Sequence, residues 1–97
     1  MKLINKEIKN ILPKLSEQDS KGLNAIAYVK FFTPDSNWSW YATEFDGNDI
    51  FFGLVDGLCK ELGYFSLSEL ESVRGPLGLK IERDLYFEPI TLEELMK

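Results

Sequence analysis

Residues 38–55 read WSWYATEFDGNDIFFGLV, two apolar runs on either side of the turn sequence DGND at residues 46–49. Asp-Gly between two strand-like runs is a strong signal of a β-hairpin, because glycine adopts positive φ without strain and aspartate tolerates it. We therefore expect two antiparallel strands joined by a tight turn, with the rest of the chain built around them.

The length of this turn predicts which residues of the two strands face each other. A four-residue loop pairs Phe45 with Ile50, Thr43 with Phe52 and Tyr41 with Leu54. Because side chains alternate between the faces of a strand, this register groups Tyr41, Phe45, Ile50, Phe52 and Leu54 on one face. The other face then holds Trp38, Trp40, Ala42 and Glu44 with Phe51, Gly53 and Val55. Both faces are largely apolar, which predicts that the hairpin lies inside a sheet and that other parts of the chain pack on both of its faces.

The flanking sequence predicts the remaining elements. Apolar residues spaced three and four apart indicate an amphipathic helix over residues 2–12, and the polar residues 16–24 indicate a loop. Strand formers occupy residues 25–32 and 62–65, while residues 79–87 suit one bulged strand or two short pieces. Capping-box sequences begin at Ser66 and Thr91 and predict two short helices after them. The expected fold is α+β: a mostly antiparallel sheet of four or five strands, with the N-terminal helix packed on one face, in a single domain spanning residues 1–97.

Composition limits the functions that this chain can have. It has 97 residues, of which 44% are hydrophobic, enough to build a core without disulfide bonds. Sixteen acidic and eleven basic residues give a net charge of −5. This balance disfavours nonspecific binding of nucleic acid, which needs a basic face, and it permits a basic protein partner.

The residue types that carry much of enzyme chemistry are scarce. Cys59 is the one cysteine and there is no histidine, so neither an internal disulfide nor a cysteine–histidine nucleophile can form. The N-terminal residues lack the apolar core of a signal peptide, and no apolar run is long enough to span a bilayer. We expect a cytoplasmic protein that uses no cofactor or metal and does not contact the membrane.

Acidic residues around the predicted hairpin form the first candidate site. Glu44, Asp46, Asp49 and Asp56 lie around the ends of the predicted hairpin, and Glu61 follows them. They could imitate phosphates against a basic groove, or hold a cation for hydrolysis, since Mg²⁺ and Ca²⁺ prefer oxygen ligands. The alternative is that they only shape the turns, which turn chemistry alone would explain.

Three basic residues near turns form the second candidate site. Arg74, Lys80 and Arg83 could grip a phosphate or carboxylate, with Trp38 or Trp40 as a stacking platform for a single-stranded nucleic acid. The alternative is that the arginines form internal ion pairs that hold loops, and that the tryptophans belong to the core.

Three longer phrases of the sequence carry a family resemblance. They are FFTPDSNWSWYATEFDG at residues 31–47, ELGYFSLSELESVRGPLGL at residues 61–79 and IERDLYFEP at residues 81–89. In these phrases the chain resembles DUF2958, a bacterial family, over roughly residues 2–95. The resemblance implies a small protein of plasmids, phages and integrative elements, and it implies no particular activity, cofactor or catalytic residue. Lys80 departs from the family pattern, which often has proline there.

Together these features favour a non-catalytic protein of a mobile element that binds another protein. One form would be an inhibitor of a host defence enzyme that acts on nucleic acid, of the anti-CRISPR or anti-restriction type. The alternatives are an accessory factor that binds single-stranded nucleic acid and a small metal-dependent hydrolase.

Overall fold

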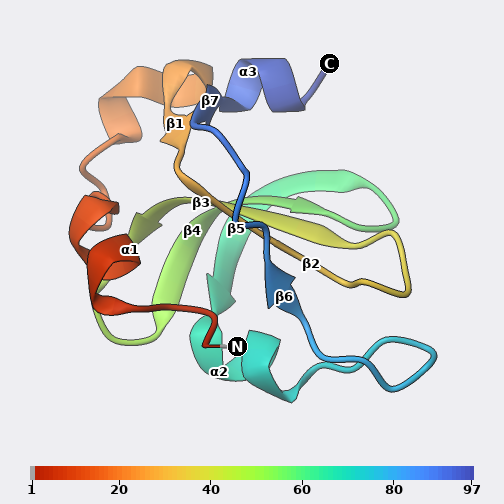
Figure 1. The fold of residues 1–97 in the computed structure, drawn as a ribbon. Coiled ribbons are helices and arrows are strands. Elements are labelled where there is room, and N and C mark those ends of the chain that lie inside the picture. The colour runs from red at the N-terminus through yellow and green to blue at the C-terminus, as the bar shows by residue number, and fades with distance from the viewer. Residues whose placement is uncertain (1) are drawn as a thin grey trace.

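The computed structural model describes residues 2–97 (Figure 1). Its elements follow one another as α1 (Lys6–Ile11), the 3₁₀-helix η1 (Asp19–Asn24), β1 (Ile26–Ala27), β2 (Val29–Phe32), β3 (Ser39–Phe45), β4 (Ile50–Asp56), β5 (Lys60–Ser66), α2 (Leu67–Ser72), β6 (Glu82–Arg83), β7 (Ile90–Thr91) and α3 (Leu92–Leu95). Five strands form an antiparallel sheet in the order β5-β4-β3-β2-β6, and β1 pairs with β7 in a separate two-stranded sheet. The fold is α+β, as the sequence predicts.

The hairpin of β3 and β4 lies inside the sheet, and both of its faces are covered. On one face a large cluster of apolar side chains includes Phe31, Trp40, Phe51 and Phe65. On the other face Leu54 packs with Ala25 and Leu92 in a smaller cluster. Figure 1 shows η1, the β1–β7 pair and α3 above the sheet, with α2 and the N-terminal segment below it. The expectation of cover on both sides is confirmed.

The register of the hairpin agrees with the expected one only away from the turn. Tyr41 lies opposite Leu54, but Phe45 lies opposite Phe51, not opposite Ile50. The cause is an irregularity between Ala42 and Glu44, where the extra residue Thr43 breaks the ladder as a β-bulge and its hydroxyl donates to Phe52 O at 3.0 Å. The bulge moves Phe45 to the face that carries Trp40, and Glu44 to the opposite face beside Phe52.

The N-terminal helix is shorter than expected and only partly packed. α1 begins after Asn5, whose side-chain oxygen accepts from Ile8 N at 2.8 Å, and none of its residues is buried. Leu3 and Leu12, which the sequence places in the helix, are buried on either side of it. Phe45 N donates to Pro13 O, so α1 lies beside the end of the sheet where β3 turns into β4 (Figure 1).

Four further expectations need correction. The strand expected over residues 25–32 divides into β1 and β2, because Tyr28 N bonds to Ala42 O while β1 pairs with β7. The expected loop at residues 16–24 contains η1, and β5 is longer than residues 62–65. Of residues 79–87 only Glu82 and Arg83 form a strand.

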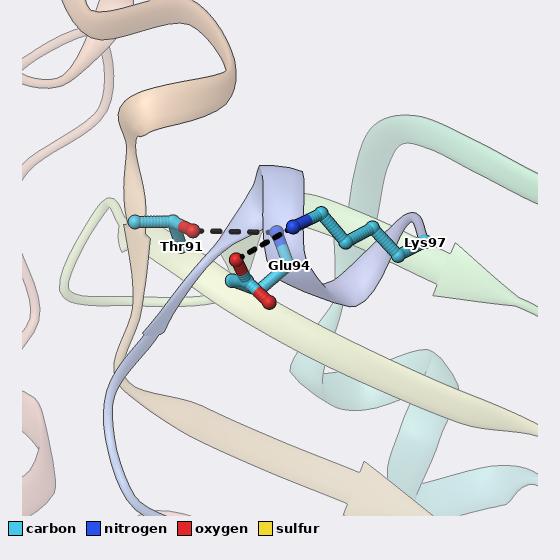
Figure 2. A network of polar contacts seen from close by, with 3 residues as sticks. All are labelled: Thr91, Glu94 and Lys97. Atoms are coloured by element: carbon cyan, nitrogen blue, oxygen red, sulfur yellow. Dashed lines mark hydrogen bonds and ion pairs between the residues drawn. The ribbon is translucent and has the colours of Figure 1, made fainter.

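Both expected helix caps are present. Ser66 Oγ accepts from Glu69 N at 3.1 Å at the start of α2. In α3, Thr91 Oγ1 accepts from Glu94 N at 3.3 Å, and Glu94 pairs with Lys97 at 3.0 Å (Figure 2). Lys60 Nζ also donates to Leu95 O and Lys97 O, so α3 is attached to β5. Within residues 2–97, none of these helices is long and apolar enough to cross a membrane.

Candidate functional site

A groove of about 640 Å³ crosses the face of the sheet that carries Trp40. This volume lies in the range of pockets that hold a ligand or an anchoring side chain. Its lining is mostly apolar and comes from three strands, α2 and two loops: Thr33, Ser36, Trp38, Trp40, Val55, Tyr64, Phe65, Glu69, Val73, Arg74, Gly75 and Pro76. We call this feature the tryptophan groove.

The two tryptophans form one wall and differ in exposure. Their rings stack with centroids 6.0 Å apart and an interplanar angle of 29°. Trp40 is buried, as expected for a core residue, whereas Trp38 keeps 37% of its surface exposed. A Cβ added at Gly57 would lie 2.3–2.5 Å from atoms of the Trp38 ring. The absence of a side chain at Gly57 therefore lets the Trp38 ring lie against the β4–β5 turn.

A loop of residues 74–80 forms the opposite wall and is tied to the loop before β3. Asp35 Oδ2 accepts from Leu77 N at 2.7 Å. Gly75 N donates to Leu79 O, and Arg74 and Lys80 pair as an isolated antiparallel bridge. A Cβ on Gly75 would lie only 1.6 Å from Asp35 Oδ1, so this close approach requires glycine.

Exposed leucines flank the tryptophan groove. Leu58, in the turn after β4, is 97% exposed, and Leu77, in the loop of residues 74–80, is 81% exposed. In Figure 1 these two segments and the β2–β3 loop lie at the right-hand end of the sheet, opposite the β3–β4 turn. These leucines leave apolar side chains exposed at the end of the sheet that carries the groove.

The groove carries two charged side chains of opposite sign, Arg74 and Glu69. Arg74 Nη1 donates to Glu71 O and Val73 O, both at 2.9 Å, which fixes the guanidinium at the end of α2. Arg74 is exposed, so its remaining donors can reach a ligand.

Of the other two basic candidates, Lys80 lies opposite Arg74 in the isolated bridge, and Arg83 lies in β6. Arg83 Nη1 donates to Leu3 O at 2.6 Å and to Lys2 O at 3.3 Å, so Arg83 holds the N-terminal segment against β6. Lys80 borders a separate, small cavity next to Leu3 and Ile81. The structure therefore brings the backbones of Arg74 and Lys80 together, but Arg83 does not line the groove and holds the N-terminal segment instead.

Glu44 does not belong to a surface cluster of carboxylates, which corrects the first candidate site. Its side chain is only 3% exposed. Its two carboxylate oxygens accept from Ser16 N at 2.9 Å and from Gln18 N at 2.7 Å. Gln18 is also buried and bonds to Ile26 and to Thr43 O, so this network fastens the chain before η1 to the sheet. The β-bulge at Thr43, which the sequence does not reveal, turns Glu44 to this side.

The turn carboxylates are also used within the fold. Asp46 Oδ1 accepts from the backbone N–H groups of Asn48, Asp49 and Ile50 at 2.8–3.0 Å, and these bonds lower the pKa of Asp46 below its ordinary value of 3.8. Asp49 accepts from Ser68 N and Ser68 Oγ and so caps α2. Asp56 is half-buried at the last position of β4, opposite Lys60. Within residues 2–97 no group of three or more metal-ligating side chains is placed to hold a metal ion.

The sequence pattern does not identify several residues in and beside the groove as functional. Val73, Gly75 and Pro76 look like the end of a helix, and Leu58 and Leu77 look like ordinary turn residues. Only the turn cluster around Asp35 hints at a structured loop, because aspartate there can accept backbone hydrogen bonds. The contact between that loop and residues 74–80 is long-range and becomes visible only in the fold.

One of three comparisons with known proteins gives a match, and it agrees with the family resemblance. No curated protein and no solved structure gives a significant match to the chain. The family model described as "Protein of unknown function (DUF2958)" matches residues 3–94, nearly the whole sequence. The chain therefore belongs to the DUF2958 family.

Proposed function

We propose that this chain is a non-catalytic binding module of a mobile element, and that it holds a protein partner at the tryptophan groove. The observation that carries the proposal is the groove itself: a hollow lined by Trp38, Trp40, Val55 and Val73 and flanked by the exposed side chains of Leu58 and Leu77. Aromatic side chains beside a preformed pocket are the usual anchors of protein interfaces.

The charge of the chain supports a partner with a basic surface. The net charge is −5, and charge complementarity steers encounter and selects partners. Proteins that act on nucleic acid carry such basic surfaces. This supports the form of the proposal in which the partner is a host defence enzyme of the CRISPR or restriction type. The carboxylates of Glu44, Asp46 and Asp49 are used within the fold, so the contact would depend on the groove and not on phosphate imitation by these three residues.

Photo-crosslinking in the native host tests the proposal. A photoreactive amino acid replaces Leu58 or Leu77, and a matched control replaces Tyr86, which is 92% exposed and does not line the groove. We expect a discrete protein adduct from positions 58 and 77 and none from position 86. Absence of an adduct at both positions 58 and 77, or equal adducts at all three, would contradict the proposal.

One observation favours a second candidate, binding of single-stranded nucleic acid. The stacked rings of Trp38 and Trp40 share the groove with the Arg74 guanidinium, and aromatic platforms beside arginine bind unpaired bases. This function predicts quenching of tryptophan fluorescence by a thymidine oligonucleotide, weakened by added salt and abolished by Trp38→Ala. No quenching at low salt would remove it.

A further inference from the structure

The two edges of the five-stranded sheet differ in how well they are protected. At one edge β6 has two residues, and short edge strands are a common protection against pairing with another chain. At the other edge β5 has seven residues, with no proline and no break in its pairing to β4. Edge strands of this kind are templates for a further strand.

The hydrogen bonds at the two ends of β5 show which of its backbone groups face outward. Leu67 N donates to Asp49 O at 2.7 Å, and Gly57 N donates to Cys59 O at 3.2 Å. In an antiparallel ladder, hydrogen-bonded pairs recur at every second position, and both of these bonds fit the β4–β5 register. The residues of β5 whose backbone groups bond to β4 are therefore Glu61, Gly63 and Phe65. The N–H and C=O groups of Leu62 and Tyr64 therefore point away from β4, toward the open edge.

The side chains at this edge are apolar and accessible. Leu62 is 43% exposed and Tyr64 is 69% exposed, and both lie on the face of the sheet that carries Phe52. The charged residues of β5, Lys60 and Glu61, are confined to one end of the strand. Lysine or another charge near the middle would discourage pairing, and β5 has none there.

We propose that β5 binds β5 of a second copy of this chain, in an antiparallel pair whose two-fold axis passes through Gly63. Gly63 is the middle residue of β5, so this register pairs every residue of the strand. It places Leu62 of each copy against Tyr64 of the other, so that each covers the other's exposed apolar surface. It also places Lys60 opposite Ser66 and Glu61 opposite Phe65, so no two like charges face each other.

The size of the contact sets the strength of this dimer. Seven paired residues on each side bury less than the roughly 800 Å² per partner of a stable interface, so the dimer should dissociate on dilution. The inference rests on β5 and not on the proposed function, although the two surfaces meet at Tyr64, which lines the tryptophan groove while Leu62 and Gly63 do not.

Sedimentation equilibrium of the purified chain, from roughly 1 μM to roughly 1 mM, tests the proposal because this range spans the dissociation constants of weak complexes. We expect a monomer–dimer equilibrium whose dissociation constant rises at least about tenfold in Leu62→Lys. Tyr86→Lys, which makes the same charge change outside β5, should leave it unchanged. A monomer at every concentration, or an equal effect of both variants, would overturn the proposal.

A cysteine at Gly63, on the proposed two-fold axis, tests the register of the pair. This test remains valid even if Leu62→Lys does not fold. Gly63 is suited to this because nothing lies within 4 Å of a Cβ added there. Opposed residues of a non-hydrogen-bonded pair have Cα atoms about 4.5 Å apart, which a disulfide can bridge. In a Cys59→Ser background, Gly63→Cys should form a disulfide-linked dimer on mild oxidation, while Glu93→Cys should remain monomeric. Equal crosslinking of both variants, or none in Gly63→Cys, would refute pairing through Gly63.

Discussion

Glu44 shows how one buried carboxylate can hold a segment of chain without an ion pair. It accepts from the backbone N–H groups of Ser16 and Gln18, and Ser16 has a φ of 73°, which is unusual for a residue other than glycine. A buried N–H that loses its acceptor keeps the full cost of its desolvation. The network of Glu44 and Gln18 therefore fastens the chain before η1 to the sheet.

Replacing this carboxylate should destabilise the fold. Glu44→Ala leaves two N–H groups without an acceptor, and we expect the free energy of unfolding to fall by about 2–4 kcal/mol. Urea denaturation followed by circular dichroism measures the change. Glu93→Ala, which removes an exposed carboxylate of α3, should change stability by less than about 0.5 kcal/mol. A loss of the same size in both variants would show that the network around Glu44 is not what stabilises this region.

Gly57 controls the position of Trp38. A Cβ at residue 57 would collide with the indole ring, so Gly57→Ala should push the ring out toward solvent. We expect the tryptophan emission to shift to longer wavelength. Gly63→Ala is the matched control, because a Cβ there meets no atom within 4 Å. Unchanged emission in Gly57→Ala would mean that the turn can move aside at little cost.

At the scale of elements, the β3–β4 turn combines a glycine at positive φ with a carboxylate that accepts three N–H groups. Gly47 has a φ of 87°, and the bonds to Asp46 lower its pKa. Because the folded state favours the charged carboxylate, its contribution to stability is present above the ordinary value of 3.8 and is lost as the pH falls through the lower, folded-state pKa.

This linkage predicts a pH dependence that Asp46→Asn should reduce. The wild-type chain should be more stable than the variant at about pH 7, and this advantage should shrink on acidification to about pH 2. Chemical denaturation of both proteins across this range measures the difference. If the stability difference stayed constant with pH, Asp46 would titrate alike in the folded and unfolded chains.

Local signals in the sequence were sufficient to predict the elements whose ends are set by neighbouring residues. The turn at residues 46–49 and the helices capped by Ser66 and Thr91 depend on contacts three or four residues apart, so their residue types predict them. The β-bulge at Thr43 depends on packing between strands, and no residue type demands it. For that reason the face of Glu44 was predicted wrongly while Tyr41 was paired correctly.

At the scale of the whole molecule, the two ends of the sheet have different roles. One end is closed by α1, the β3–β4 turn and the chain around Gln18. The other end holds the tryptophan groove between loops that are brought together by Asp35 and Gly57. Composition and charge predicted a binding protein, but the groove depends on contacts between residues about forty positions apart, which a sequence pattern does not reveal.

Hydrogen–deuterium exchange on the chain bound to its crosslinked partner protein tests the central proposal, that the tryptophan groove is the contact surface. Binding slows exchange of amides that it shields or orders. We expect slower exchange in residues 33–38, 57–59 and 74–80, with little change in residues 84–89. Protection confined to the turn at residues 46–49, or to residues 84–89, would contradict it.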